Sequence, residues 1–179
     1  MENQKYTSKE TSINKHKVPA LVRAFAKVCE DTKTTDLDIL DYGGGKYDTA
    51  TEYLAKFGLR NHIYDPYNRT PEENKAALEN WEYDVVLLSN VLNVIAEPGV
   101  RNHILHEIYD HLSYGGLLLV KVYEGNRSGI MTVNEKNNSC QLNKKLSEYI
   151  PELVHVFGEN FVIRRTVNGV QIILAMSGE

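Results

Sequence analysis

The chain contains 179 residues, of which 42% are hydrophobic and 25% are charged, and its formal net charge is −4. This length and composition predict a single globular domain with a sizeable hydrophobic core. The negative net charge argues against a broad surface that coats nucleic acid, although it is compatible with a local basic patch. No apolar run approaches the roughly 20 residues that a membrane span needs.

The cysteines and the polar N-terminal segment indicate a reducing environment. Cys29 and Cys140 are far apart and show neither a metal-binding nor a redox spacing. Residues 1–17 are polar and lack the apolar stretch of a signal peptide, so we expect a cytoplasmic protein. We expect this segment to precede one folded domain over residues 18–179.

Apolar residues recur in patterns that predict strands alternating with helices along this domain. Thr70 and Glu73 are spaced as a helix capping box, and Gly115-Gly116 is expected to end a later helix. The expected helices cover residues 18–29, 48–57, 71–80, 100–112 and 142–157, the last being interrupted or restarted at Pro151. The expected strands cover residues 37–41, 61–64, 83–90, 117–123, 161–167 and 170–176.

This order of elements predicts an α/β fold, in which a mostly parallel sheet carries helices on both faces. Asn168-Gly169, between the last two strands, is a strong signal for a C-terminal antiparallel hairpin. The polar stretch from Glu124 to Gln141 is expected to form an irregular loop, of the kind that often binds a ligand or closes over one.

Residues 37–48 show the pattern of a strand, a glycine turn and the start of a helix. Asp41 ends the expected strand, and Gly43, Gly44 and Gly45 follow within four positions. Glycine adopts backbone angles that other residues avoid, and it lets a ligand approach the main chain. A turn of this kind before a helix N-terminus also presents free N–H groups. We therefore expect a small molecule to bind here.

Three classes of ligand compete for this turn. A phosphate-binding P-loop needs a hydroxyl after Lys46, but Tyr47 occupies that position. A dinucleotide site needs a third glycine where Asp48 stands, and a carboxylate there would repel a pyrophosphate. A ligand with a cationic amino-acid part and a neutral nucleoside remains, and S-adenosylmethionine is such a ligand.

At this point the chain resembles the class I S-adenosylmethionine-dependent methyltransferases, over roughly residues 37–123. Their first motif, an acidic residue followed by G-x-G, matches residues 41–45, and their acidic residue after the second strand matches Asp65. Their later motif, on the fourth strand, matches Asp84 through Ser89 and Asn90. The resemblance implies a Rossmann-like fold, S-adenosylmethionine as cofactor and methyl transfer as the activity.

The resemblance also implies roles for individual residues. Asp65 would accept both ribose hydroxyls, which requires an ionised acceptor. Asp41 and Asp48 would favour the ammonium and sulfonium charges of the cofactor. The full set of expected cofactor-binding residues is Asp41, Gly43, Gly44, Gly45, Asp48, Asp65, Pro66 and Asn90.

A narrower resemblance concerns the methyltransferases associated with DNA phosphorothioation, which are larger than this chain. It rests on residues 11–15, 41–43, 64–67 and 89–95. It implies DNA modification as a setting without identifying a substrate, so nucleic acid stays open as a partner.

The chain departs from the family between Asp65 and Asp84, where only 18 residues are available. The capped helix uses about half of them, so we expect the family's third strand to be missing or vestigial. That strand usually carries a polar residue that recognises adenine. Trp81 is a candidate for stacking on adenine, and a buried structural role is its alternative.

No catalytic residue is identified from the sequence. The candidates for contact with an acceptor are Asn90, Tyr123 and Glu124, against which stand a simple turn role for Asn90 and a core position for Tyr123. The Asp/Asn-Pro-Pro-aromatic motif of amino-directed DNA enzymes is absent after the expected strand 83–90, and no cysteine lies near a strand end.

A metal centre is not expected, and the surface role of two polar segments stays open. His103, His106 and His111 are expected on the solvated side of their helix, without a zinc signature. The polar N-terminal segment and the 124–141 loop either cover the cleft together or remain solvated.

Three hypotheses follow from the sequence. The first is a methyltransferase acting on an unidentified acceptor. The second is a cofactor-binding interaction protein without catalysis, for which the missing third strand is the argument. The third is a nicotinamide-dependent oxidoreductase, which Asp48 disfavours. The oligomeric state is not predicted.

Overall fold

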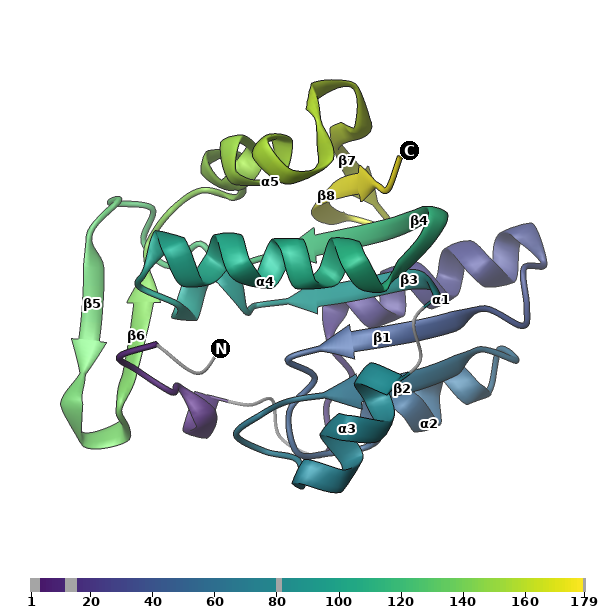
Figure 1. Cartoon of the computed structure of the whole chain (residues 1–179), viewed down its shortest axis with the longest axis horizontal. Coiled ribbons are helices and arrows are strands. Elements are labelled where there is room, and N and C mark those ends of the chain that lie inside the picture. Colours follow the sequence, from purple (N-terminus) through teal and green to yellow (C-terminus); the bar gives the residue numbers. More distant parts are fainter. Residues whose placement is uncertain (1–3, 12–15, 80–81, 179) are drawn as a thin grey trace.

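The computed structural model describes residues 4–11, 16–79 and 82–178. Within these residues, a six-stranded sheet has the order β2-β1-β3-β4-β8-β7 (Figure 1). The first four strands in this order are parallel; β8 pairs antiparallel with β4, and β7 pairs antiparallel with β8. The strands are β1 (Asp38–Tyr42), β2 (Arg60–Tyr64), β3 (Tyr83–Ser89), β4 (Leu112–Lys121), β7 (Val162–Val167) and β8 (Val170–Met176). The predicted α/β fold and its C-terminal hairpin are confirmed.

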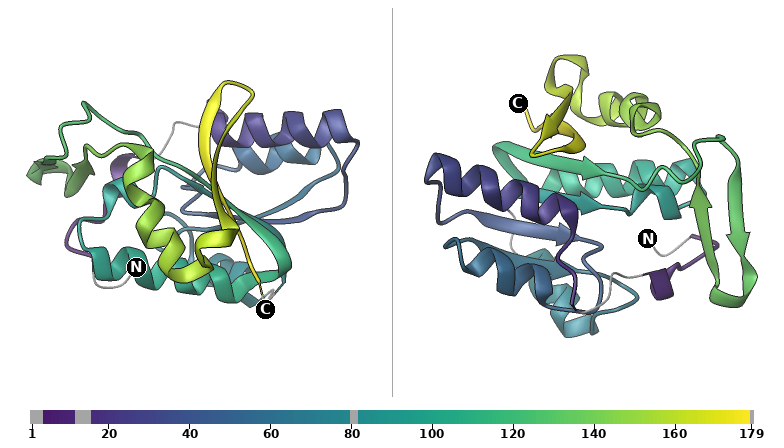
Figure 2. Two further views of the ribbon diagram at one scale, coloured as in Figure 1. Left: turned by 90° about the horizontal axis from the view of Figure 1, so that it is seen from above. Right: turned by 180° about the vertical axis from the view of Figure 1, so that it is seen from behind.

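Helices cover both faces of this sheet (Figures 1 and 2). One face packs against α1 (Ala20–Thr32) and α2 (Thr49–Ala55), and the other packs against α3 (Pro71–Glu79), α4 (Pro98–His111) and α5 (Ile150–Phe157). Short 3-10 helices lie between the main elements. They are η1 (Lys9–Thr11), η2 (Leu92–Val94), η3 (Glu135–Asn137), η4 (Leu146–Tyr149) and η5 (Glu159–Phe161).

The alternation of side chains along β3 explains the two layers. Val85 and Leu87 belong to the core under α1 and α2, whereas Val86 and Leu88 belong to the core under α4 and α5. Successive residues of a strand point to opposite faces, so a strand buried on both faces must be apolar throughout. The near-continuous apolar run of the sequence therefore predicts this central strand correctly.

The expected loss of the family's third strand is confirmed for the described residues. The chain passes from β2 through α3 to β3, and β2 forms the edge of the sheet. The predicted capping box of α3 is also present. The Thr70 N–H donates to Glu73 Oε2 at 2.8 Å, and the Glu73 N–H donates to Thr70 Oγ1 at 3.2 Å.

Gly115-Gly116 does not end a helix, because α4 already ends at His111 and both glycines lie inside β4. The pairing of β3 with β4 shifts register between Tyr83 and Val85, opposite this part of β4. A Cβ atom on Gly116 would lie 3.0 Å from the Tyr83 carbonyl oxygen. Gly116 therefore permits the close approach of two strands, and Gly115 adopts a φ angle of 74°. The sequence signal does not distinguish these needs from a helix stop.

The 124–141 stretch is not an irregular loop throughout. It contains an antiparallel hairpin of β5 (Met131–Asn134) and β6 (Ser139–Leu142), whose turn is held by the Asn134 side chain. All residues of β5 are exposed, so the short apolar–polar alternation from Met131 to Asn134 lies within a polar stretch and faces no core. The expected helix 142–157 begins only at η4, because Leu142 pairs with Met131 within the hairpin.

The boundary between a polar segment over residues 1–17 and a domain over residues 18–179 stays a prediction. Residues 4–11 do contact the body of the protein, as described below. Across the described ranges, no helix combines the length and the apolar character that crossing a membrane requires.

Arg101 ties α4 to α5 and supplies a test of the fold. Its side chain is 2% exposed, and its guanidinium donates to both carboxylate oxygens of Glu152 at 2.8 Å and to the Ile95 carbonyl oxygen at 2.8 Å. Arg101→Ala should lower the free energy of unfolding by about 3 kcal/mol, because Glu152 and a buried carbonyl lose their partner. Urea denaturation measures this loss.

The matched control is Lys75→Ala, which removes an ion pair of α3 whose two side chains are largely exposed. Its effect should stay within about 0.5 kcal/mol. Equal effects of the two substitutions would contradict the assigned role of Arg101.

Candidate functional site

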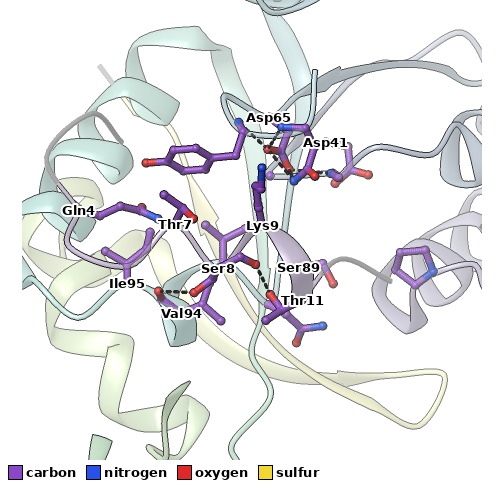
Figure 3. A pocket seen from close by; sticks show the side chains of 18 residues that line it. Gln4, Thr7, Ser8, Lys9, Thr11, Asp41, Asp65, Ser89, Val94 and Ile95 are labelled. Carbon is purple, nitrogen blue, oxygen red and sulfur yellow. Dashed lines mark hydrogen bonds between the residues drawn. The ribbon is translucent and has the colours of Figure 1, made fainter. Parts of the chain in front are cut away.

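The carboxyl ends of the parallel strands meet at one edge of the sheet, where the chain leaves β1 and β3 in opposite directions. Ligands of open α/β sheets bind at such a switch point. A cavity of about 120 Å³ lies here (Figure 3). It is lined by the ends of β1, β2 and β3 and by N-terminal residues, namely Gln4, Thr7, Ser8, Lys9, Thr11, Pro19, Asp41, Gly43, Gly44, Gly45, Asp65, Tyr67, Asn68, Ser89, Asn90, Val91, Val94 and Ile95.

The glycine turn after β1 forms the floor of this cavity and leaves no room for side chains. A Cβ atom on Gly43 would lie 2.5 Å from Val91 Cγ2, and one on Gly44 would lie 2.8 Å from the Asp41 carboxyl carbon. Gly43 and Gly45 also have φ angles of 77° and 79°, which favour glycine. Gly43 is therefore required by both the backbone path and the space, Gly44 by the space, and Gly45 by the backbone path.

Asp41 lies beside the turn with an unpaired carboxylate oxygen. Its side chain is 2% exposed, and within the described residues Oδ2 has no hydrogen-bond partner. Burial, and then the negative charge of Asp65, raise the pKa of Asp41 to about 7, whereas Arg69 acts in the opposite direction. A buried acceptor of this kind is costly unless a donor or cation satisfies it, so the position suits a cationic group.

Asp65, after β2, holds the turn in place. Its Oδ2 accepts a hydrogen bond from the Gly45 N–H at 2.9 Å, and its Oδ1 accepts from the N–H groups of Tyr67 and Asn68 at 3.0 Å. The Asn68 side-chain amide donates to Oδ1 at 3.1 Å. Ribose hydroxyls would compete with Asn68 for this carboxylate, so the expected ribose contact requires the Asn68 amide to move.

Asp48 and Pro66 do not line the cavity, and their cofactor contacts stay predictions. Asp48 occupies the N-cap of α2 but makes no side-chain cap hydrogen bond. Instead, its Oδ1 accepts from Arg69 Nη1 at 2.7 Å, and Arg69 Nε donates to the Gly45 carbonyl oxygen at 2.8 Å. Asp48 thus acts on the turn through Arg69.

Asn90 follows β3 and faces two cavities. Its φ angle is 60°, and its N–H donates to the Lys121 carbonyl oxygen at 2.8 Å, which places it beside the end of β4. In the described part of the chain, its Oδ1 and the Ser89 hydroxyl lack hydrogen-bond partners. Both side chains are therefore free to bind a ligand.

Tyr123 and Glu124 behave differently from one another. Tyr123 is 61% exposed, so the alternative of a core tyrosine is wrong, and it lines a neighbouring cavity instead of the first one. Glu124 accepts from the Leu146 N–H at 2.7 Å and from Arg127 Nε at 2.6 Å. Its carboxylate thereby fixes the start of η4, which gives it a structural contact.

Residues 4–11, which we call the N-terminal strap, cover the cavity (Figure 3). Ser8 is buried, and its N–H donates to the Asn138 carbonyl oxygen at 3.0 Å. Its hydroxyl accepts from the Cys140 N–H at 3.3 Å and donates to the Val94 carbonyl oxygen at 3.4 Å. The strap therefore links the β5–β6 hairpin to η2 above the glycine turn.

The histidine helix gives no metal centre. Across the described ranges, no group of three or more metal-ligating side chains comes together. His111 is 6% exposed, so its expected position on the solvated side of α4 is wrong. His111 is the last residue of α4, and β4 begins at the next residue, Leu112. This direct connection keeps His111 buried.

Several lining residues had no sequence signal that set them apart. Gln4, Thr7 and Ser8 reach the site only because the chain folds back over it, and Asn68 is identified only by its bonds to Asp65. Trp81 and residues 12–15, which contribute to two of the sequence hypotheses, lie outside the described residues.

The sequence profile of the methyltransferase domain family matches residues 13–156, which is more than half of the chain. The chain belongs to the class I methyltransferases. S-adenosylmethionine is the cofactor of this family, and the methyltransferase neighbours below include structures crystallised with it or its product. No curated protein sequence matches the chain.

Solved structures of methyltransferases share the fold. One is the 1,6-didemethyltoxoflavin-N1-methyltransferase of Burkholderia thailandensis, with bound 1,6-didemethyltoxoflavin and S-adenosylhomocysteine. Its TM-score is 0.65 at 17% identity, and the match covers 89% of this chain and 79% of that chain. Another is the magnesium protoporphyrin IX methyltransferase of Synechocystis with bound S-adenosylmethionine. Its TM-score is 0.53 at 11% identity, and the match covers 88% of this chain and 78% of that chain.

A third structural neighbour acts on RNA. It is a 16S rRNA methyltransferase of T. thermophilus in complex with S-adenosylmethionine and guanosine, with a TM-score of 0.54, 15% identity, and coverage of 90% of this chain and 44% of that chain. The three names cover unrelated acceptors. At these identities the likeness establishes the fold and leaves the acceptor of this methyltransferase open.

Asp41 makes the stability of the methyltransferase depend on pH. Its folded pKa is raised from 3.8 to about 7, so between these values the folded state holds a proton that the unfolded state has lost. The free energy of unfolding should therefore fall as pH rises through this window. Between pH 4.5 and pH 7.5, urea denaturation should show a fall that is about 2–3 kcal/mol larger for the wild type than for Asp41→Asn, which carries no titratable proton.

Asp36→Asn is the matched control, because the Asp36 side chain is 83% exposed and asparagine tolerates its positive φ angle. Its pH profile should follow the wild type. Parallel profiles for wild type and Asp41→Asn would contradict the burial of a protonated Asp41.

Proposed function

We propose that the methyltransferase binds S-adenosylmethionine on the glycine turn and transfers its methyl group to an acceptor at the carboxyl ends of β3 and β4. The observation that carries this proposal is the buried, unpaired Asp41 carboxylate beside a turn that excludes side chains. The ammonium group of the cofactor would satisfy Asp41, and this pairing would also lower the pKa of that carboxyl.

Asp65 is the proposed partner of the ribose hydroxyls. Two lone pairs on each carboxylate oxygen are shared at present among the Gly45, Tyr67 and Asn68 donors. Displacement of the Asn68 amide would free acceptor capacity without breaking the bond from the Gly45 N–H. The turn would then keep its position while the ribose enters.

When bound, S-adenosylmethionine supplies an electrophilic methyl group, and the acceptor's lone pair forms the new bond while the carbon–sulfur electrons stay on sulfur. The protein's own part is to align the two reactants and exclude water. Ser89 and Asn90 line the cavity and would contact the cofactor, which the N-terminal strap would cover. A proton released by the acceptor would pass to solvent.

The acceptor, the cellular setting and the nicotinamide-dependent alternative are also addressed by this proposal. The resemblance to methyltransferases associated with DNA phosphorothioation is a reason to include DNA among the acceptors tested. A cytoplasmic setting is supported by Cys29 and Cys140, which are both free and buried. Family membership argues against the nicotinamide-dependent alternative.

The rival proposal is a cofactor-binding protein without catalysis. One argument for it is the third strand, which in the family carries a residue that recognises adenine and which is missing from the described residues. The other is the cavity volume of about 120 Å³, which is smaller than the roughly 300 Å³ usual for ligand pockets. Movement of the N-terminal strap would enlarge that cavity.

Removal of Asp65 tests the cofactor site. Asp65→Ala should weaken the binding of S-adenosylhomocysteine roughly 10- to 100-fold, because two charge-assisted hydrogen bonds to ribose are lost. Isothermal titration calorimetry gives the dissociation constants, and circular dichroism verifies that the variant is folded. Asp110→Ala, an exposed change on α4, is the control and should bind as the wild type does. A folded Asp65→Ala variant with unchanged affinity would refute the ribose assignment.

Transfer of a labelled methyl group separates enzyme from binder. Tritiated S-adenosylmethionine is incubated with the protein and, in parallel, with a small-metabolite extract, RNA and DNA. We expect label in the small-metabolite pool. Cofactor binding without label in any pool would favour the non-catalytic rival.

A further inference from the structure

A second cavity adjoins the cofactor cavity and has no role so far. Its volume is about 520 Å³, and it lies between the ends of β3 and β4, η2 and the β5–β6 hairpin. The two cavities share Thr11, Asn90 and Val94. Among the described residues, the lining is Thr11, Lys17, Asn90, Asn93, Val94, Lys121, Tyr123, Thr132, Val133, Asn134, Ser139, Cys140 and Gln141.

The side chains around this second cavity are cationic, neutral polar or apolar. Within the described ranges, Lys17 and Lys121 are the charged members of the lining, and no carboxylate of those ranges belongs to it. Amides and hydroxyls supply the other polar groups, while Val94 and Val133 supply apolar surface. A cavity of this composition attracts an organic anion and offers nothing to pair with a cation.

Lys121 lines this cavity and also borders a neighbouring one that contains Glu124 and Arg127. It stands at the last position of β4, opposite Ser89 of β3, and its carbonyl oxygen accepts the Asn90 N–H. No hydrogen bond or ion pair of its ammonium group is found in the described part of the chain. The nearby Glu124 carboxylate is already engaged by Arg127 and by the Leu146 N–H. Burial lowers the pKa of Lys121, because the charged ammonium group loses part of its hydration. An anion that pairs with the ammonium would offset this desolvation cost.

The wall opposite Lys121 is anchored on several sides. Asn93 is buried, and its side-chain amide donates to Gln141 Oε1 at 3.0 Å. The Gln141 amide in turn donates to the Tyr123 carbonyl oxygen at 2.9 Å. The hairpin is also held by the strap through Ser8. Figure 1 shows this hairpin standing beside the sheet, next to the N-terminal strap. The cavity is therefore built by packed segments.

We propose that this second cavity binds the methyl acceptor, and that the acceptor is a small organic acid whose carboxylate or phosphate group lies against Lys121. Asn90, which faces both cavities, would position the acceptor's nucleophilic atom toward the methyl group. The volume falls in the range of about 300–1,000 Å³ that is usual for small-molecule sites. A nucleic acid would require many more cations than the two lysines that the described part of the lining supplies.

This inference rests on the proposed methyl transfer, so the test separates the two. Wild-type protein saturated with S-adenosylhomocysteine is titrated with benzoate, 4-hydroxybenzoate, 3,4-dihydroxybenzoate and phenyl phosphate, each beside its uncharged amide or alcohol counterpart. Isothermal titration calorimetry reports binding. We expect at least one acid to bind ten or more times tighter than its neutral counterpart.

Lys121→Met removes the charge and keeps the length of the side chain. The acid should bind this variant at least tenfold more weakly, while the affinity for S-adenosylhomocysteine stays unchanged. Lys136→Met is the matched control, since Lys136 lies on the hairpin turn outside the lining, and it should leave both affinities unaltered.

The outcomes are distinct. If S-adenosylhomocysteine does not bind the wild type, the proposed function fails. If S-adenosylhomocysteine binds but no acid of the panel does, or acids bind no better than their neutral counterparts, or Lys121→Met binds the acid as the wild type does, only the present inference fails.

Discussion

The carboxylate of Asp65 is the constraint on which the site depends. It accepts the Gly45 N–H from the turn after β1 and N–H groups of the loop after β2. Two parallel strands that end side by side are thereby joined by one anionic group. Since an ionised acceptor forms stronger hydrogen bonds than a neutral one, a single residue can keep the glycine turn open. Burial and the charge of Asp65 raise the pKa of Asp41 to about 7, so Asp41 is partly protonated near neutral pH and the repulsion between the two carboxyl groups is reduced.

The same residue also explains how the fold manages without a third strand. With β2 at the edge of the sheet, the loop that leaves it has no neighbouring strand to support it. Asn74 of α3 replaces that support. Its Oδ1 accepts the Asp65 N–H at 2.8 Å, and its Nδ2 donates to the Asp65 carbonyl oxygen at 3.1 Å. The capping box fixes the start of α3, so a short helix holds what a strand usually holds.

Sequence reasoning succeeded where one physical requirement dominates a stretch. Apolar β3, the capped α3 and the Asn168-Gly169 hairpin each follow from local rules, and the acidic residue after β2 lies at the predicted strand end. It failed at Gly115-Gly116, because glycines that permit strand contact look the same as glycines that stop a helix. It also failed for β5, which is exposed and is held by contacts distant in sequence.

The candidate site was predicted in part for a similar reason. Asp41 lies near the end of β1, and the three glycines, Asp65 and Asn90 follow strand ends, whose meeting point is dictated by the parallel sheet. The strap residues and the lining around Lys121 depend on how the hairpin and the N-terminal segment fold back. That information is tertiary. Asp48 lies before α2 as predicted, but its carboxylate accepts a hydrogen bond from Arg69, which the sequence spacing does not predict.

The position of Ser8 has a kinetic consequence. It bonds at once to η2 and to Asn138 and Cys140 of the hairpin, so the cover of one cavity is also a brace for the wall of the other. A cofactor that enters by lifting this segment must loosen the hairpin, and the wall can close again only once the segment has returned. Opening of one cavity is therefore tied to loosening of the other, and the two are expected to open and close on a common timescale.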